Sequence, residues 1–505
     1  MTDAVTDNAT NATDATADLA ASRLTAKVWN LAGVMNNAGV GAGDYVEQVT
    51  YLLFLKLDAE REEDGLPSLV PPSCRWSAWA GLRGAALKTA YEEALKLLAA
   101  QPGLPGTVFA RAANRIEEPA FLSRLVALVN AETWSAFGAD VKGAIYEGLL
   151  ERTASDVKSG AGQYFTPRPL IEAVVEVVDP QPSHTICDPA CGTGGFLLAA
   201  WEHMRAHPAL RDQNTARRVR RGGFAGWDIV AGVARLASMN LFLHGLGNDA
   251  PGALPPVRRA DALLADPGTR WSLVLTNPPF GRKQSLRVFT GDEAEAERDD
   301  YARPDFRETT GNKQLNFVQH CMTVLAEDGT AAVVLPDNVL FEAGAGERIR
   351  RRLLAEFDCH TLLRLPTGIF YRQGVKANVL FFDARPRRAE PWTEALWVYD
   401  LRTNNRFTLK ERPLRQEHLR EFVQLARLAD RHARTEDPAR ERWRRYGYAE
   451  LAARDRLDLN LSWLKEAGAA DPATLPPPAE IAAGIADELD AALARFRAVA
   501  ERLAG

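Results

Sequence analysis

The sequence predicts an α/β protein: a central parallel sheet covered by helices, preceded by a helical domain and followed by a helical extension. The first observation is that short β-rich runs alternate with amphipathic helical segments after about residue 151. The second is that residues 21–150 and 401–505 carry apolar residues at helical spacing. The third is size, because 505 residues, 46% hydrophobic and 25% charged, suffice for about three globular domains.

The chain begins with a segment unlike the rest. Residues 1–20 are rich in Thr, Asp, Ala and Asn, and we expect a disordered tail there. Residues 21–150 are expected to form an N-terminal helical domain, since Val46, Val49, Leu53 and Leu57 recur at helical spacing. Prolines divide this region into short helices.

The central region, residues 151–400, is expected to hold the sheet. The candidate strands are residues 184–187, 224–227, 271–276, 330–335, 361–365 and 377–382, with 395–401 as an added edge strand. The candidate helices between them are residues 196–204, 231–243, 315–325 and 347–357. Open α/β sheets bind ligands at the carboxyl ends of their strands, so residues that follow strands are the candidate site.

The last region, residues 401–505, is charged and helical, with a proline cluster at 475–478 as a spacer. Its end carries a continuous apolar stripe at steps of three or four residues: Ile481, Ile485, Leu489, Leu493, Phe496, Val499 and Leu503. Such a stripe must cover something. Two interpretations stay open: it packs on its own domain, or it docks on a partner subunit.

Composition narrows the class of protein. Five cysteines at irregular spacings fit neither a disulfide framework nor a zinc site, and the pairs His320-Cys321 and Cys359-His360 lack metal-ligand spacing, so we expect no metal. We expect a cytoplasmic protein, because no leader-like start and no apolar run of roughly 18 residues is present. With a net charge of −5, any grip on DNA must come from local patches or from a partner.

A glycine-rich turn, Asp-Pro-Ala-Cys-Gly-Thr-Gly-Gly-Phe at 188–196, follows one candidate strand and opens a helix. Glycines there let the backbone approach a ligand closely. A structural turn and a dinucleotide site are alternatives. The acid Asp188 at the strand end and the absence of Gly-x-Gly-x-x-Gly spacing favour S-adenosylmethionine. The candidate cofactor contacts in this turn are Asp188, Ala190, Gly192, Thr193, Gly194 and Gly195.

Two more acids end candidate strands. Asp228 stands where the ribose hydroxyls of a nucleoside cofactor would be bound, although a cap for the helix that starts near Val230 is the more ordinary role of a lone aspartate. Asp261 follows the run 257–260 and could accept the amine of the cofactor's adenine.

The sharpest motif is the loop Asn277, Pro278, Pro279 and Phe280, which ends an apolar strand. The exocyclic nitrogen of adenine is a poor nucleophile because its lone pair is conjugated with the ring. The side-chain oxygen of Asn277 and the backbone carbonyl of Pro278 could accept both N–H groups and free that lone pair. Phe280 would stack on the base, which implies a base pulled out of the duplex. A purely structural Asn-Pro turn is the alternative.

Further candidates have weaker signals. A glycine-hinged loop before a helix could close over the cofactor, or could be simple loop-to-helix punctuation. Its candidate residues are Gln163, Tyr164, Phe165, Thr166, Pro167 and Arg168. The arginine runs at 217–221 and 440–446 could touch phosphates, with Trp443 and Tyr446 stacking on nucleic acid, but such runs are usually solvated surface.

The three motifs in this order resemble those of the modification subunits of type I restriction-modification enzymes. The segments 363–370 and 374–382 are similar to later strands of that family, and 51–57 to its helical N-terminal domain, so the resemblance covers about residues 24–465. It implies a Rossmann-like S-adenosylmethionine-dependent methyltransferase core. It also implies that residues 163–168, 193–195 and Asp228 bind the cofactor and that residues 277–280 hold the target adenine of duplex DNA. The long basic stretch 205–223 departs from the family's pattern.

The same resemblance implies partners: a specificity subunit flanked by two modification subunits, and an ATP-driven restriction subunit. The C-terminal helices would contact the specificity subunit. Three alternatives remain. They are an N-methyltransferase for another substrate, such as a protein glutamine or RNA, a cytosine N4 methyltransferase, and a non-catalytic DNA-binding subunit. The first usually has a shorter chain, the second usually begins the loop with serine, and an intact Asn277, Phe280 and Asp228 argue against the third.

Overall fold

The computed structural model describes residues 23, 26–30, 39–137, 142, 145–150, 166–248, 250, 252–280, 303–370, 375–409 and 411–465. Several expectations therefore lie outside the described residues: the tail at 1–20, the residues 163–165, and the apolar stripe at 481–503. The chain divides into two compact units, Met1–Ser462 and Trp463–Gly505, and nearly all described residues belong to the first.

The described part of the N-terminal region is helical, as expected. Its helices are α2 (Ala42–Glu63), α3 (Trp76–Trp79), α4 (Gly84–Ala99), α5 (Gly103–Val108) and α6 (Pro119–Asn130), with short 3-10 turns η1 (Pro72–Cys74) and η2 (Trp134–Ala136). The apolar residues that recur along α2 and α4 are buried in one core that also includes Trp79 and Trp134. In the described part of the chain, no helix is both long and apolar enough to cross a bilayer.

A nine-stranded sheet forms the centre of the first unit, in the order β3-β2-β1-β4-β5-β7-β6-β8-β9. Its strands are β1 (Ile186–Asp188), β2 (Phe224–Asp228), β3 (Val257–Arg259), β4 (Trp271–Thr276), β5 (Leu325–Pro336), β6 (Phe357–Arg364), β7 (Ala377–Ala384), β8 (Ala395–Asp400) and β9 (Trp443–Gly447). The strands β1 to β5 pair in parallel, which confirms the α/β class.

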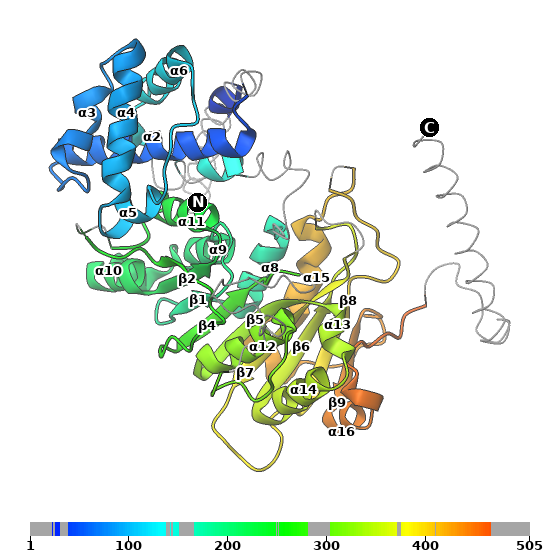
Figure 1. Ribbon diagram of the computed structural model, residues 1–505. Helices are drawn as coiled ribbons and strands as arrows, with labels where there is room; N and C mark the ends of the chain where they lie inside the picture. Colours follow the sequence, from blue (N-terminus) through cyan, green and yellow to red (C-terminus); the bar gives the residue numbers. More distant parts are fainter. Residues whose placement is uncertain are drawn as a thin grey trace, which may run out of the picture. The chain divides into compact units, whose positions relative to one another are not determined.

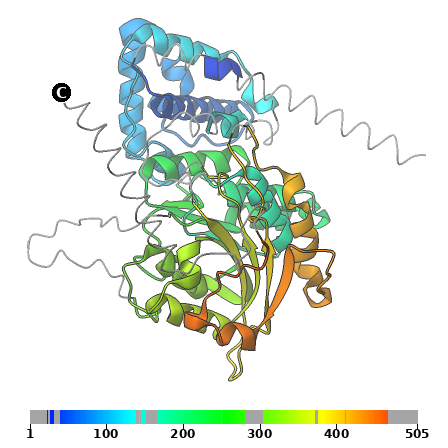
Figure 2. The same cartoon turned by 90° about the vertical axis from the view of Figure 1, so that its right-hand side faces the viewer.

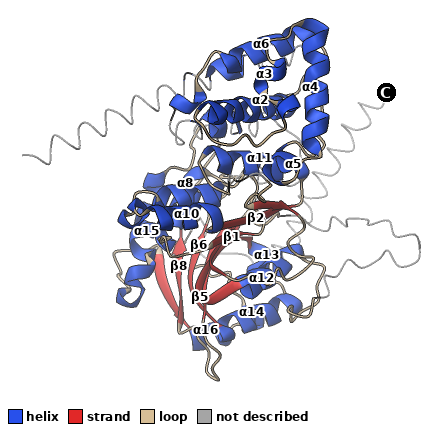
Figure 3. Cartoon of the chain, turned by 90° about the vertical axis from the view of Figure 1, so that its left-hand side faces the viewer, coloured by secondary structure: helices blue, strands red, loops and turns tan. Residues whose placement is uncertain are grey.

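Helices cover both faces of the sheet (Figure 3). One core joins the sheet to α8 (Arg168–Val178), α9 (Gly195–Met204), α11 (Ala231–Leu243) and α15 (Gln416–Ala426). On the other face, α12 (Lys313–Val324) contacts β5 and α14 (Ala345–Glu356) contacts β6. The remaining helices are α10 (Gln213–Gly222), α13 (Asp337–Phe341), α16 (Tyr448–Ala452), η3 (Pro208–Arg211), η4 (Leu428–Ala433) and η5 (Asp455–Leu457).

The sheet differs from the prediction in two ways. It is mixed, because β7 runs antiparallel to both β5 and β6. The physical reason is the connection between β6 and β7, residues 365–376, whose described part contains no helix, whereas a parallel return usually needs a crossover helix. The expected edge strand β8 is internal, because β9 pairs beyond it. The sheet therefore extends past residue 400, into the region expected to be only helical.

Helix α11 joins the helical region to the sheet. It contacts α2 and α5 on one side and β2 and β3 on the other (Figures 1 and 2). Its Arg235 is 3% exposed, forms an ion pair with Glu47 of α2, and donates to the backbone oxygen of Ala110. A buried arginine with partners on another element holds the two regions together strongly, because loss of those partners would leave a charge without compensation.

Candidate active site

The predicted motifs meet at the switch point of the sheet. From β1 the chain moves outward to β2 and β3, and then returns to β4 on the other side of β1. Ligands bind at such points in open α/β sheets. Asp188 ends β1 and Asn277 follows β4, and these strands are neighbours. The Thr276 hydroxyl donates to Asp188 Oδ1 at 2.6 Å, so the glycine-rich turn and the Asn-Pro-Pro-Phe loop lie side by side.

The glycine-rich turn has the backbone that its sequence requires. Gly192 has φ of 55° and Gly194 has φ of 89°, both in the left-handed region that favours glycine. A Cβ atom on Gly194 would lie 3.1 Å from Leu241 Cδ1 of α11. The Asn240 amide, also on α11, donates to the Thr193 backbone oxygen at 3.2 Å. The turn thus packs against α11, which fixes it, and leads directly into α9.

Among the described residues, Asp188 and Asp228 form no ion pair with a cationic side chain. Burial raises the pKa of Asp188 to about 7, with a smaller contribution from the Asp228 carboxylate, while hydrogen bonds from Thr276 and the Ala190 backbone act in the opposite direction. Burial likewise raises the pKa of Asp228 to about 6, against hydrogen bonds from the backbones of Val230 and Gly192. Two neighbouring carboxylates whose pKa values are raised by burial are typical of a functional site that receives a cation or a hydrogen-bond donor.

Asp228 also fulfils the structural alternative. Its Oδ1 accepts from the Val230 backbone N–H at 2.7 Å, just before α11 begins. A carboxylate has two oxygens with about four acceptor sites, so the backbone bonds from Val230 and Gly192 leave room for ligand hydroxyls. The two interpretations of Asp228 are therefore compatible.

Asp261 follows β3 and lies near the turn. Its Oδ1 accepts from the Leu263 backbone N–H at 2.9 Å, and Leu263 belongs to a small apolar cluster that contacts Ala190. The third predicted acid therefore lies beyond the end of β3, the strand next to β2, and near the glycine-rich turn.

Asn277 is half-buried at the end of β4. Its Nδ2 atom donates to the Thr166 hydroxyl at 2.8 Å, while its Oδ1 atom is buried and has no hydrogen-bond partner among the described residues. The Gln314 side chain at the start of α12 donates to the Pro279 backbone oxygen at 3.3 Å, which fixes the loop. The loop thus holds Asn277 Oδ1 as a fixed acceptor that is unpaired among the described residues. An exocyclic amine would need such an acceptor for one of its N–H groups.

Phe280 is packed more tightly than its predicted role suggests. It is 6% exposed and contacts Phe370 edge to face, with ring centroids 5.9 Å apart. Stacking on a base would require one of the two rings to move. The expected stacking would therefore require a rearrangement. In this structure the Phe280 ring packs in the hydrophobic core.

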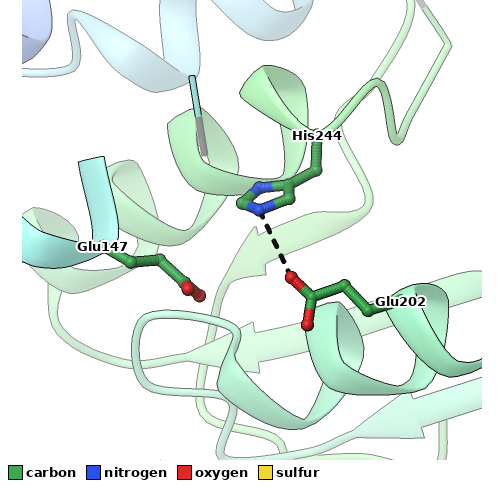
Figure 4. A group of neighbouring side chains, drawn as sticks. All are labelled: Glu147, Glu202 and His244. Atoms are coloured by element: carbon green, nitrogen blue, oxygen red, sulfur yellow. Dashed lines mark ion pairs between the residues drawn. The ribbon is translucent and has the colours of Figure 1, made fainter. Parts of the chain in front are cut away.

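Arg168 is surrounded by carboxylates. Its guanidinium bonds both oxygens of Glu147 at 3.1 Å, Glu172 at 3.0 Å, and Glu202. Glu147, Glu202 and His244 face one another from three segments of the chain (Figure 4), and their ligand atoms lie within 4.8 Å of one another. A metal ion would have to displace the guanidinium, which already binds Glu147 and Glu202. These contacts explain Arg168 as a residue that anchors the start of α8, and they involve no ligand.

The two arginine runs differ from each other. The run at 217–221 lies on α10, which leads into the amino end of β2 and therefore lies toward the edge opposite the site. In the run at 440–446, Trp443 and Tyr446 belong to β9, and each is 4% exposed. Trp443 stacks on Trp397 at 5.2 Å, so these aromatic rings pack within the protein and are covered from nucleic acid.

Three residues of the site escape sequence reasoning. Thr276 holds Asp188, Asn240 holds the glycine-rich turn, and Gln314 holds the Asn-Pro-Pro-Phe loop. Thr276 has a faint signal, as the polar end of an apolar strand. Asn240 and Gln314 have none, because they lie inside helices whose pattern concerns only their apolar face.

Comparison with known proteins agrees with this geometry. Residues 138–457 match the family model of N-6 DNA methylases, and residues 24–129 match the model of the HsdM N-terminal domain. The chain is 35% identical to the StySJI methylase subunit of Salmonella typhimurium and to the EcoKI methylase subunit of Escherichia coli, in each case over 95% of both chains.

Solved structures give the same result. The crystal structure of the EcoKI M protein has 31% identity and a TM-score of 0.53, and covers 96% of both chains. A structure from a study of complex assembly and conformational transition in the type I system has 28% identity and a TM-score of 0.71, over 95% of this chain and 98% of that one. With a family model over most of its length and relatives aligned from end to end, the chain belongs to the N-6 DNA methylase family, among the methylase subunits of type I restriction enzymes.

Proposed function

We propose that this chain transfers a methyl group from S-adenosylmethionine to the exocyclic N6 amine of an adenine extruded from duplex DNA. One observation carries the proposal: the buried Asn277 Oδ1 has no partner among the described residues, beside two acids of raised pKa. Bound S-adenosylmethionine would supply an electrophilic methyl group on a positively charged sulfur.

The residues present fit that cofactor. Asp188 and Asp228 would favour its positive charge and accept hydrogen bonds from its ammonium group or its ribose. Burial raises the pKa of both carboxylates, and no cation is among the groups that shift those pKa values. The turn at Gly192 and Gly194 brings backbone, without side chains, to the same edge. Asp261 is the third candidate acceptor, for the cofactor's adenine.

The Asn-Pro-Pro-Phe loop would act on the base. Asn277 Oδ1 and the Pro278 carbonyl would accept the two N–H groups of the target amine, which would free its lone pair. They would also stabilise the positive charge on nitrogen when its bond to the methyl carbon forms and the carbon–sulfur bond breaks, until the amine loses one proton to water. Prolines make this loop rigid and add no competing donors. Preorganised acceptors of this kind are worth about 10²- to 10³-fold in rate.

We further propose that the chain works in a type I assembly, with a specificity subunit that reads the DNA sequence, two modification subunits for each specificity subunit, and a restriction subunit for cleavage. The net charge of −5 supports this, because such a chain gains little affinity for DNA by itself. The cytoplasm is the compartment in which such an assembly would act.

The test is transfer of labelled methyl from S-adenosylmethionine to DNA, with the specificity subunit present, followed by nucleoside analysis of the product. Asn277→Ala should lose transfer and keep cofactor affinity. The matched control is Asn114→Ala, which removes another half-buried amide, one that bonds Glu92 and the Ile116 backbone in the helical domain. Equal activity of Asn277→Ala and wild type, or methylcytosine as the product, would overturn the proposal.

A further inference from the structure

We infer that Thr166 is a positioning residue, whose hydroxyl holds the side-chain amide of Asn277 so that its Oδ1 atom faces the target amine. The inference rests on the proposed function. It assigns Thr166 a role that differs from the cofactor contact expected for its motif.

The geometry joins two distant parts of the sequence. Asn277 Nδ2 donates to Thr166 Oγ1 at 2.8 Å, across 111 residues. An amide group is planar, so a bond that fixes its nitrogen also fixes the direction of its oxygen. That oxygen is buried and has no partner among the described residues. Leaving such an acceptor unpaired costs about 1–3 kcal/mol, so an orientation kept at that cost is one that a ligand's donor can use.

The same bond affects the chemistry of the amide. When an amide N–H donates to an acceptor, the carbonyl oxygen becomes more negative and accepts more strongly, an effect of hydrogen-bond chains in a medium of low dielectric constant. Thr166 therefore orients Asn277 Oδ1 and also strengthens it as an acceptor.

Thr166 is itself held in place. It precedes Pro167, whose ring fixes φ near −56°, and then Arg168, the first residue of α8. The guanidinium of Arg168 is bound by three carboxylates, as described above. The hydroxyl that touches Asn277 thus stands two residues from a strongly anchored point, which explains how a loop residue can hold a catalytic side chain precisely enough to matter.

The test compares Thr166→Val, which keeps the shape and removes the hydroxyl, with Thr166→Ser, which keeps the hydroxyl. The assembled methyltransferase is used, and three quantities are measured: the single-turnover rate of methyl transfer at saturating cofactor and DNA, the Kd for S-adenosylmethionine, and the melting temperature. The control is Thr185→Val. Thr185 accepts from the Ser272 backbone at 3.2 Å at the amino end of β1, on the opposite edge of the sheet.

We expect Thr166→Val to slow transfer by about 10- to 100-fold, with an unchanged cofactor Kd. Thr166→Ser should recover most of the rate, and Thr185→Val should transfer at the wild-type rate. If valine lowers the melting temperature, the serine variant decides: recovery of rate and stability together with a normal cofactor Kd supports positioning by the hydroxyl.

Three results would overturn the inference. The first is a normal saturated rate in Thr166→Val, and the second is a weakened cofactor Kd that accounts for the whole loss, which would make Thr166 a cofactor contact. The third is failure of serine to recover the rate. Asn277→Ala separates the two ideas: if it is inactive and Thr166→Val is not, only the positioning role fails, whereas full activity of Asn277→Ala ends the proposed function.

Discussion

Two halves of the same sheet edge hold aspartate in opposite ways. At the ends of β1 and β2, Asp188 and Asp228 have no cationic partner among the groups that shift their pKa values, and burial raises both. After β5, Asp337 is half-buried, yet Arg402 binds both of its oxygens at 2.7 and 2.8 Å and Asn378 donates at 2.8 Å. Burial alone would raise the pKa of Asp337, but these contacts hold it below its usual value.

The difference separates a structural acid from one kept for a ligand. Asp400, at the end of β8, belongs to the structural group: it accepts from the backbones of Arg402 and Thr403 and from the Thr403 hydroxyl, each at 2.8 Å. In the β5–β8 half, Asp337 and Asp400 therefore hold loops together through their hydrogen bonds. In the β1–β4 half, the carboxylates of Asp188 and Asp228 have no compensating cation among the described residues. An uncompensated buried acid destabilises the protein until something positive or hydrogen-bonding arrives.

The largest expected effect comes from removing the cation that pairs with Asp337 in the β5–β8 half. Arg402→Met should lower the free energy of unfolding by up to about 3–5 kcal/mol, because Asp337, only 16% exposed, would lose its cation. Urea unfolding at pH 8 measures this. The control is Arg351→Met, whose pair with Glu347 lies on an exposed helix face and should contribute less than about 1 kcal/mol. Similar losses in the two variants would contradict the distinction between the halves.

Removal of the charge from the uncompensated half should do the reverse. The folded-state pKa of Asp188, about 7, lies above its ordinary 3.8, so its contribution to stability is present below about pH 4 and is lost as the pH rises through 7. Asp188→Asn should therefore stabilise the cofactor-free chain at pH 8, by roughly 4 kcal/mol at most.

The same variant should bind S-adenosylmethionine more weakly, which calorimetry measures alongside the melting temperature. Asp337→Asn is the matched change in the other half, and it should lower stability at pH 8. A less stable Asp188→Asn chain would show that the acid is needed for folding.

The pH dependence of cofactor affinity gives a third test. Since the pKa values of Asp188 and Asp228 are about 7 and about 6, both carboxylates gain protons as the pH falls from 8 to 5. Affinity for S-adenosylmethionine should fall by at least about tenfold over that range. In Asp228→Asn the dependence should shrink and shift toward the pKa of Asp188. An affinity that stays flat between pH 8 and 5 would exclude both acids as cofactor contacts.

The smallest effect concerns the glycine-rich turn. Gly194→Ala should cost about 1–2 kcal/mol for a left-handed backbone, and more because its Cβ would lie 3.1 Å from Leu241 Cδ1. Gly192→Ala has a similar positive φ but open space around the new Cβ, so it isolates the backbone cost. Thermal unfolding and cofactor Kd should rank Gly194→Ala as the more damaging variant, and the opposite rank would mean that the ligand lies against Gly192.

Much of the site follows from the sequence alone, because it consists of residues that end strands. Apolar runs placed β1, β2 and β4 within two residues of their observed ends, and the residues directly after them are Asn277 and the turn that follows Asp188. In a parallel arrangement such ends share one edge, so local pattern and a general rule of topology suffice. The helical N-terminal region is equally local, since its core repeats at helical spacing.

The tertiary structure alone decided what surrounds those residues. Spacing along the chain does not distinguish Asp188 from Asp337, because the difference between them is a partner, Arg402, that is 65 residues away from the latter in sequence. The contact between Thr166 and Asn277, the edge strand β9 and the packing of Phe280 on Phe370 are likewise set by distant parts of the chain. Hydrogen-bond partners, burial and pKa values depend on neighbours in space, and a one-dimensional pattern encodes those only where neighbours in space are also neighbours in sequence.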